Sequence, residues 1–215
     1  MFVSMEETNN IFKMSKGAVK IKLENNISSS GVLLNFQRNN KQFYCLLTNQ
    51  FVITPDIINK KQTINILDSK KDKNLLIKLD SKERIIQCFK ESLNIDATII
   101  EILEKDGLDD SYFLKPSNVS LETIVNKDIV LFHYPKGKQL SFSEGRIIGI
   151  NSQNQNEFYH DSSTLEGSSG GPIALRGEKT VIGIHKGTVL NKPKNIGIFI
   201  KNIIDRMKNY KKEGE

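Results

Sequence analysis

The feature of this 215-residue sequence that most restricts its fold is a two-residue alternation of apolar and polar side chains in short segments between turn-forming residues. In residues 18–23, Val19, Ile21 and Leu23 share one face of an extended chain, because successive side chains of a strand point to opposite faces. Further segments of this kind cover residues 31–36, 42–48, 62–67, 75–79, 84–89, 97–103, 128–133, 140–150, 172–175, 180–185 and 197–200. Many short strands joined by turns predict an all-β barrel or sandwich.

The C-terminal region departs from this alternation. Ile200, Ile203, Ile204 and Met207 recur at helical spacing, which predicts an amphipathic helix that packs on the second half of the chain. A polar stretch over residues 104–110 marks the start of a connection between two halves. We therefore expect one domain with three parts: an N-terminal β-barrel over residues 16–103, an inter-barrel linker over 104–127, and a C-terminal β-barrel with the terminal helix over 128–215.

Composition and charge argue against several functional classes. The net charge of +6 comes mostly from scattered lysines, and the one dense basic cluster, residues 208–212, is the expected polar end of the helix. A nucleic-acid groove needs clustered basic residues with aromatic stacking partners, so we expect no nucleic-acid partner. No apolar run approaches the length of a membrane span, and we expect no membrane partner. No cofactor and no metal ion are expected.

The N-terminal residues and the cysteines bear on the compartment. Residues 1–20 are polar and lack the apolar segment and small-residue cleavage site of a secretory signal, which predicts a cytoplasmic protein. Cys45 and Cys88 agree with this, because secreted domains of this size usually carry several disulfides. We expect two free buried thiols, although a bridge between them stays open at this point.

Ser169 lies in the most informative segment of the sequence, with Gly167 two residues before it and Gly170 and Gly171 directly after it. Glycine adopts positive φ angles that direct backbone N–H groups to one point, where they can bind an anion. A serine held in such a backbone presents its hydroxyl beside an oxyanion hole. The alternative is an ordinary glycine-rich turn between two strands.

This segment carries a resemblance to a known family. Residues 167–172 read Gly-Ser-Ser-Gly-Gly-Pro, and the apolar segment 181–187 follows after a hairpin. Together they resemble the trypsin-like serine peptidase family, which has the chymotrypsin fold, and most of all its intracellular and bacterial branches, including the glutamyl endopeptidases. The resemblance covers residues 16–207 and implies two six-stranded antiparallel β-barrels with a C-terminal α-helix.

The same resemblance assigns roles to individual residues. It implies that Ser169 stands at the position of the nucleophile and that the N–H groups of Gly167 and Ser169 form the oxyanion hole. Asp96, in Asp96-Ala97-Thr98, matches the aspartate of the catalytic triad, although an acidic residue at a strand start is common without catalysis.

The histidine of the triad is missing. The family pattern is Leu-Thr-Asn-x-His-Val, whereas residues 47–52 read Leu-Thr-Asn-Gln-Phe-Val and place Phe51 at the position of the histidine. The three histidines of the chain, His133, His160 and His185, all lie in its second half, so none is expected to reach the serine from the first barrel. Loss of the base costs about a millionfold in turnover in another serine protease. Phe51 is expected to fill the gap between the barrels with apolar volume.

Further residues near the serine match the glutamyl endopeptidases. Thr164 and His185 stand where those enzymes have a threonine and a histidine, and a hydroxyl and an imidazole can together hold a carboxylate. The alternative for His185 is a hydrogen-bonded strand residue. The backbone from Gly187 onward can pair with an extended peptide. Ser168 replaces the aspartate that captures a new N-terminus in digestive members, so activation by cleavage is not expected.

Three functional hypotheses follow. The first is a catalytically inactive pseudoprotease that binds a peptide or protein segment, with a preference for an acidic side chain, in the former substrate cleft. The second is an active serine endopeptidase that prefers acidic residues and uses a non-standard base, supplied in trans or by another residue. The third is a partner-binding domain whose cleft is closed by Phe51. The oligomeric state stays open.

Overall fold

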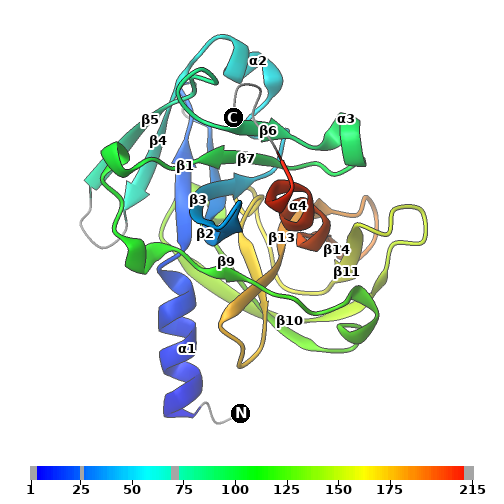
Figure 1. The fold of residues 1–215 in the computed structure, drawn as a ribbon. Coiled ribbons are helices and arrows are strands. Elements are labelled where there is room, and N and C mark those ends of the chain that lie inside the picture. The colour runs from blue at the N-terminus through cyan, green and yellow to red at the C-terminus, as the bar shows by residue number, and fades with distance from the viewer. Residues whose placement is uncertain (1–3, 25–26, 69–72, 211–215) are drawn as a thin grey trace.

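The computed structural model describes residues 4–24, 27–68 and 73–210, and their strands form two largely antiparallel β-sheets that lie one above the other in the view of Figure 1. The first sheet has the strand order β5-β4-β1-β2-β3-β7-β6. Its strands are β1 (Ala18–Lys22), β2 (Ser28–Arg38), β3 (Lys41–Thr48), β4 (Thr63–Asp68), β5 (Lys73–Lys78), β6 (Ile86–Cys88) and β7 (Thr98–Glu101). No pairing joins β5 to β6 within the described residues, so this seven-stranded sheet is a half-barrel and not the six-stranded barrel that was predicted for the first half.

The second sheet closes on itself. Its order is β12-β9-β10-β11-β14-β13-β8, and an additional pairing of β12 with β13 completes a six-stranded barrel to which β8 is attached in parallel. Its strands are β8 (Lys115–Pro116), β9 (Asp128–His133), β10 (Ser141–Ile150), β11 (Glu157–His160), β12 (Pro172–Leu175), β13 (Thr180–Thr188) and β14 (Asn195–Phe199). The bounds predicted for β9 and β12 agree with the structure, whereas β8 and β11 were not predicted.

Turn chemistry sets the register of the best-predicted hairpin. Strands β2 and β3 pair from Val32↔Leu47 to Arg38↔Lys41, which leaves a two-residue connection. Both connecting residues, Asn39 and Asn40, have positive φ angles of 49° and 60°. Asparagine tolerates this conformation, and a turn with two positive φ angles matches the right-handed twist of the flanking strands.

The described part of the chain also contains four α-helices and four short 3₁₀ turns. The helices are α1 (Met5–Ser15), α2 (Pro55–Asn59), α3 (Lys90–Leu93) and α4 (Lys201–Lys208), and the 3₁₀ turns are η1 (Glu104–Asp106), η2 (Asp110–Tyr112), η3 (Leu121–Thr123) and η4 (Pro135–Gly137). The sequence predicted α4, whereas α1 was read as a polar stretch. Helix α1 begins at the N-cap Ser4 and buries little more than Met14, so its apolar face is too narrow to stand out in the sequence. Residues 211 and 212 of the predicted basic cluster lie outside the described residues.

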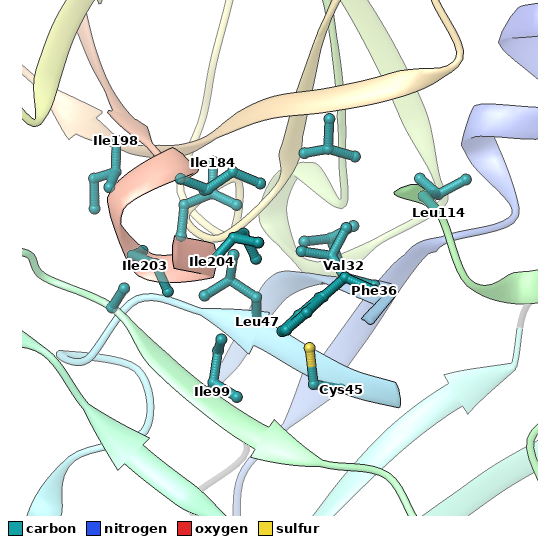
Figure 2. Close-up of a cluster of buried hydrophobic side chains, with 14 of the residues drawn as sticks. Val32, Phe36, Cys45, Leu47, Ile99, Leu114, Ile184, Ile198, Ile203 and Ile204 are labelled. Atoms are coloured by element: carbon teal, nitrogen blue, oxygen red, sulfur yellow. The ribbon is translucent and has the colours of Figure 1, made fainter. Parts of the chain in front are cut away.

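The main core lies between the two sheets, and α4 is part of it (Figure 2). Buried side chains come from the first sheet, from the second sheet and from α4, among them Val32, Leu47, Ile99, Ile184, Ile198, Ile203 and Ile204. Because the same side chains seal both sheets, the two halves form one structural unit. The predicted chymotrypsin-like fold with a C-terminal helix is confirmed.

Two smaller predictions can be compared with this fold. Cys45 and Cys88 are both free thiols; Cys45 is buried as expected, and Cys88 only partly so. Burial raises the pKa of both thiols above the ordinary value. Within the described ranges, none of the helices has the length and apolar character that crossing a membrane requires.

Candidate functional site

The backbone around Ser169 leaves two N–H groups unpaired. In the segment from Gly167 to Gly171, the N–H groups of Ser168, Gly170 and Gly171 donate to backbone carbonyls. Those of Gly167 and Ser169 donate to no residue that the structure describes. We call these two N–H groups the nest. Buried or half-buried N–H groups are almost always bonded, so an unpaired pair two residues apart is what an oxyanion hole requires before a ligand arrives.

The carbonyls of the same segment are held in place, and strand β2 supplies three of the donors. The Ser169 carbonyl accepts from the Ser30 N–H (2.9 Å) and from Ser29 Oγ (2.8 Å). Ser30 Oγ donates to the Gly167 carbonyl (2.8 Å), and the Lys136 N–H donates to the Glu166 carbonyl (2.6 Å). The two nest N–H groups share their peptide planes with the carbonyls of Glu166 and Ser168, and the Ser168 carbonyl accepts from the Gly171 N–H (3.0 Å). Neither plane can rotate without breaking a hydrogen bond, and the sequence analysis missed the serines of β2 that hold the neighbouring carbonyls.

Two glycines of the segment are required by close packing and backbone conformation. A Cβ atom on Gly170 would lie 2.1 Å from the Ser30 carbonyl oxygen, and the φ angle there is +85°. A Cβ atom on Gly171 would lie 2.4 Å from the Phe132 carbonyl oxygen. Gly167 also has a positive φ angle, +84°. The glycine pattern therefore reflects a backbone pressed between the two sheets, and the alternative of an unconstrained glycine-rich turn does not account for it.

The Ser169 hydroxyl has no base beside it in the described residues. Its Oγ donates to the Lys186 backbone carbonyl at 3.0 Å. A carbonyl oxygen accepts a hydrogen bond but does not take up the proton at neutral pH, so this contact does not activate the hydroxyl. Ser169 is half-buried and stands at the predicted nucleophile position as an ordinary serine.

Phe51 and Asp96 lie side by side, as the family pattern implies. The Phe51 N–H donates to Asp96 Oδ1 (3.1 Å), and Asn49 Nδ2 donates to the Asp96 carbonyl (3.2 Å). Burial raises the pKa of Asp96, an effect that the hydrogen bond from Phe51 and the charge of Lys186 partly oppose. The aspartate therefore still fixes the turn after β3, although the side chain that it would orient is a phenylalanine.

The prediction that Phe51 fills the gap between the barrels is wrong. Its side chain is 54% exposed, and it belongs to none of the buried clusters. The turn that places its N–H on Asp96 directs the ring away from the packed interior. The hypothesis of a cleft closed by a buried Phe51 loses its support for the same reason.

A serine–histidine pair lies directly next to Ser169, and the sequence analysis did not anticipate it. Ser168 Oγ lies 2.7 Å from His133 Nδ1 and accepts from the Leu165 N–H (3.1 Å). Burial lowers the pKa of His133, so the imidazole is neutral and its Nδ1 can accept the Ser168 proton. Ser168 is fully buried, and its Oγ is already engaged by His133 and by the Leu165 N–H, so this hydroxyl is not available to a substrate. The pair holds the segment before Ser169 where the family's digestive members have an aspartate.

The other two histidines contact each other on the far side of this segment. His160 Nε2 lies 3.2 Å from His185 Nδ1, and both side chains are buried. Burial lowers the pKa of His160 to about 4 and that of His185 to about 3, where the neighbouring His160 and His133 contribute further. Both imidazoles are therefore neutral at pH 7. Nearby, Thr164 Oγ1 donates to Asn195 Oδ1 (3.1 Å).

Strand β13 carries Gly187, the last of the predicted binding residues, and Lys186, which the sequence analysis did not anticipate. Gly187 pairs with Ile196 of β14, whereas β12 pairs with β13 only as far as Ile184, so the other side of β13 beyond this point has no partner strand in the described residues. Lys186 Nζ forms an ion pair with the buried Glu157 (2.6 Å). No group of His, Cys, Asp and Glu side chains in the described part of the chain has an arrangement that could hold a metal ion.

Comparison with known proteins identifies the family. Residues 29–184, most of the chain, match the family described as "Trypsin-like peptidase domain". The chain belongs to the trypsin-like peptidase family. A glutamyl endopeptidase of Staphylococcus epidermidis is 34% identical to it over 98 residues, which are 43% of this chain and 33% of the relative. The chain thus matches about a third of the length of that curated relative.

Solved structures agree on the fold. A serine endoprotease from Yersinia pestis superposes with a TM-score of 0.70 at 14% sequence identity, covering 96% of this chain and 67% of that one. Deg5 superposes with a TM-score of 0.67 at 18% identity, covering 95% of both chains. At these identities the similarity concerns the fold alone.

Proposed function

We propose that this trypsin-like peptidase homologue is a pseudoprotease, which binds a peptide or protein segment in the former substrate cleft without cutting it. The observation that carries the proposal is the contrast between a preformed nest and an unactivated serine. The nest N–H groups of Gly167 and Ser169 are unpaired among the described residues, whereas the Ser169 hydroxyl donates to a backbone carbonyl. The Phe51 N–H donates to Asp96, but the phenylalanine side chain cannot accept a proton.

The missing base decides the chemistry. In peptide hydrolysis the serine proton must pass to a base as Oγ attacks the carbonyl, and the same group must return a proton to the leaving amine. Removing that group in another serine protease lowers turnover about a millionfold, which corresponds to roughly 8 kcal/mol of activation free energy. An oxyanion hole alone retains an acceleration of about a thousandfold over water, too little for a useful protease.

The binding groups remain. A peptide carbonyl oxygen can accept from both nest N–H groups, and an extended backbone can add to the side of β13 beyond His185, which itself bonds to Gly170 and Gly171. Backbone pairing of this kind gives affinity with little sequence selectivity. The selectivity must come from contacts with side chains, among which Thr164 and His185 have the most specific chemistry.

The histidine pair supports an acidic side chain as the ligand there. Nδ1 of His160 is buried and has no hydrogen-bond partner among the described residues. If Nδ1 carried the proton, its buried N–H would have no acceptor. This costs more free energy than an unprotonated Nδ1 without a donor, because the N–H loses a strong hydrogen bond to water. The favoured tautomers therefore have His160 Nε2–H donating to His185 Nδ1, which leaves the Nε2–H of His185 for a carboxylate. Such a carboxylate competes with Asn195 for the Thr164 proton.

Two observations favour an active endopeptidase as the second candidate. The nest N–H groups have no acceptor among the described residues, and the chain is similar to a glutamyl endopeptidase over 98 residues. Activity would then need a base from a bound partner or an unexpected side chain. Lys186 is no such base, because its ammonium forms an ion pair with Glu157 at 2.6 Å.

The deciding experiment is reaction of the purified protein with a fluorophosphonate probe, with Ser169→Ala as the control. The wild-type protein is expected to remain unlabelled over hours. Labelling that disappears in Ser169→Ala would refute the pseudoprotease and support the second candidate. In parallel, Phe51→His is expected to gain labelling, since Asp96 already contacts the residue-51 backbone and the exposed ring leaves room for an imidazole.

Binding is tested separately by fluorescence anisotropy with labelled ten-residue peptides that differ only at one central residue, Glu, Gln or Lys. The Glu peptide is expected to bind most tightly, and the preference is expected to decrease in His185→Asn and in Thr164→Val. Absence of binding for all three peptides would refute peptide recognition by this cleft.

A further inference from the structure

A large groove adjoins the nest, no residue of β13 belongs to its described lining, and neither the family resemblance nor the site described above assigns it a ligand. Its volume is about 1020 Å³, and it lies between strands β1 and β4 of the first sheet and the segment 134–141 of the second. We call it the basic groove. Its described lining residues are Lys20, Leu67, Tyr134, Pro135, Lys136, Lys138, Gln139, Leu140, Ser141 and Leu165.

The basic groove is continuous with the nest. Leu165 lines the groove two residues before Gly167, and the Lys136 N–H donates to the Glu166 carbonyl. A Cβ atom on Gly167 would lie 2.7 Å from the Tyr134 carbonyl oxygen, so the nest and the groove wall are in direct contact. A chain whose carbonyl oxygen sits on the nest can therefore run on into the groove in one direction and along β13 in the other.

The wall of the groove is held in position from the first sheet. Lys20 Nζ donates to the carbonyls of Gly137 (3.1 Å) and Lys138 (3.3 Å), and it lies 5.7 Å from the centre of the Tyr134 ring. These contacts fix the 134–138 turn against β1. The groove is thus a structured surface rather than a gap beside a loose loop.

The charge of the groove has one sign among its described residues. Lys136 and Lys138 are exposed, their ammonium groups form no ion pair with any described residue, and no aspartate or glutamate belongs to the described lining. Leucine, tyrosine and proline side chains supply an apolar floor, and Leu165 is 55% exposed. Exposed apolar surface bordered by charge of one sign is typical of an interaction site.

From this we infer that the basic groove binds an acidic, amphipathic stretch of the same polypeptide that occupies the cleft, with carboxylates on Lys136 and Lys138 and aliphatic side chains on the apolar floor. The inference rests on the proposed function. A volume near the upper end for ligand sites accommodates several side chains, whereas a small anion would leave the apolar floor uncovered. The direct contact with the nest favours the continuation of one chain over a separate molecule.

The test measures fluorescence anisotropy of labelled fourteen-residue peptides with the full-length protein. All three carry the same N-terminal half with a central glutamate for the cleft. Their C-terminal halves alternate leucine with glutamate, glutamine or lysine. The glutamate tail is expected to bind about tenfold more tightly than the glutamine tail at low salt, and most of that gain should disappear near 0.5 M salt, because exposed charge pairs are screened.

A pair of substitutions assigns the effect to the groove. Lys136→Gln with Lys138→Gln is expected to weaken the glutamate tail about fivefold and to leave the glutamine tail unchanged, because exposed ion pairs contribute only a few-fold each in binding. Glutamine is similar to lysine in side-chain length and has similar backbone preferences. The matched control is Lys41→Gln with Lys179→Gln, which makes the same change in net charge away from the groove.

The possible outcomes distinguish failure of the groove inference from failure of the proposed function. Equal affinity for the glutamate and glutamine tails, with the central glutamate still required, overturns the inference and leaves the proposed function intact. Equal weakening by the groove pair and by the control pair also overturns it, because the attraction would then be nonspecific. If no peptide binds, both proposals fail. A groove-dependent association with anionic phospholipid vesicles or with a single-stranded oligonucleotide, without any tail preference, would assign the groove to a membrane or a nucleic acid and overturn the peptide inference.

Discussion

Acidification below pH 6.5 is expected to destabilise this protein through the buried pair of His160 and His185. The unfolded chain takes up a proton on each imidazole near pH 6.5, whereas the folded protein holds the pKa of His160 at about 4 and that of His185 at about 3. Because the folded-state pKa values are lowered, the unfolded state binds more protons as the pH falls. The stability is fully present above pH 6.5 and is lost progressively down to about pH 4.

The size of the effect follows from these values. One pKa unit of difference corresponds to about 1.4 kcal/mol, so each histidine costs about 2 kcal/mol at pH 5 and about 3 kcal/mol at pH 4. Together the pair lowers the free energy of unfolding by about 4 kcal/mol at pH 5, a large part of the 5–15 kcal/mol of a typical domain. His133, whose pKa burial also lowers, acts in the same direction. Asp96, whose pKa burial raises, acts in the opposite one.

The assay is urea unfolding followed by circular dichroism at pH 7, 6 and 5, a range in which most carboxylates remain ionised. The perturbation is His160→Gln, in which the amide can still donate to His185 Nδ1. The variant is expected to lose about 2 kcal/mol less than the wild-type protein between pH 7 and pH 5. The double variant with His185→Gln should lose still less. A surface-matched control is Lys192→Gln, which is expected to follow the wild-type pH profile.

The reasoning is refuted if the wild-type protein and the double variant lose the same stability between pH 7 and pH 5. The two imidazoles would then titrate near their ordinary pKa in the folded state. They would not form the neutral, desolvated pair from which the preference for a carboxylate was argued. A direct check is NMR titration of the histidine ring protons, which should show no protonation of either ring above pH 5.

Three further predictions concern the backbone, the interior and the turn that carries the missing base. Gly170→Ala is expected to cost more than 3 kcal/mol, whereas Gly107→Ala, with a positive φ angle but no atom within 4 Å of the added Cβ, should cost about 1 kcal/mol; comparable urea midpoints would contradict this. Arg84→Met is expected to cost about 3–5 kcal/mol in thermal or chemical unfolding, because it leaves the buried carboxylate of Asp106 without its partner at 2.7 Å; an unchanged midpoint would show that the pair is solvated. Phe51→Ala is expected to change the free energy of unfolding by less than about 1 kcal/mol, since the ring is half exposed, and a larger loss would mean that the ring packs in solution.

The comparison of sequence and structure is uneven along the chain. Strands with alternating apolar residues and a strong turn, such as β2 and β3 around Asn39 and Asn40, were predicted because their signal is local. Strand β11 was missed, since Glu157 to His160 owes its extended conformation to pairing with β10 and β14 rather than to its own pattern. The half-barrel form of the first sheet likewise depends on strand twist and closure, which no short segment records.

The features of the candidate site were likewise predictable only in part. The identities of Ser169, Asp96 and Phe51, and with them the absence of a base, could be read from short motifs whose spacing reflects local backbone geometry. The partners of these residues could not. That Ser169 Oγ donates to the carbonyl of Lys186, or that Ser168 contacts His133, follows from the packing of segments far apart in the sequence.

The sequence by itself determined the family and the strand-rich fold, and it predicts the positions of the triad and the loss of its histidine, because each of these depends on a contiguous stretch of residues. Only the tertiary structure decided that the nest N–H groups have no acceptor among the described residues, that the Phe51 ring points to solvent, that His160 and His185 share a buried contact, and that Lys136 and Lys138 border a groove beside the nest. These are consequences of burial and of contacts between distant segments. Burial and long-range contacts depend on the positions of all segments in the folded chain, and no local pattern of side chains encodes them.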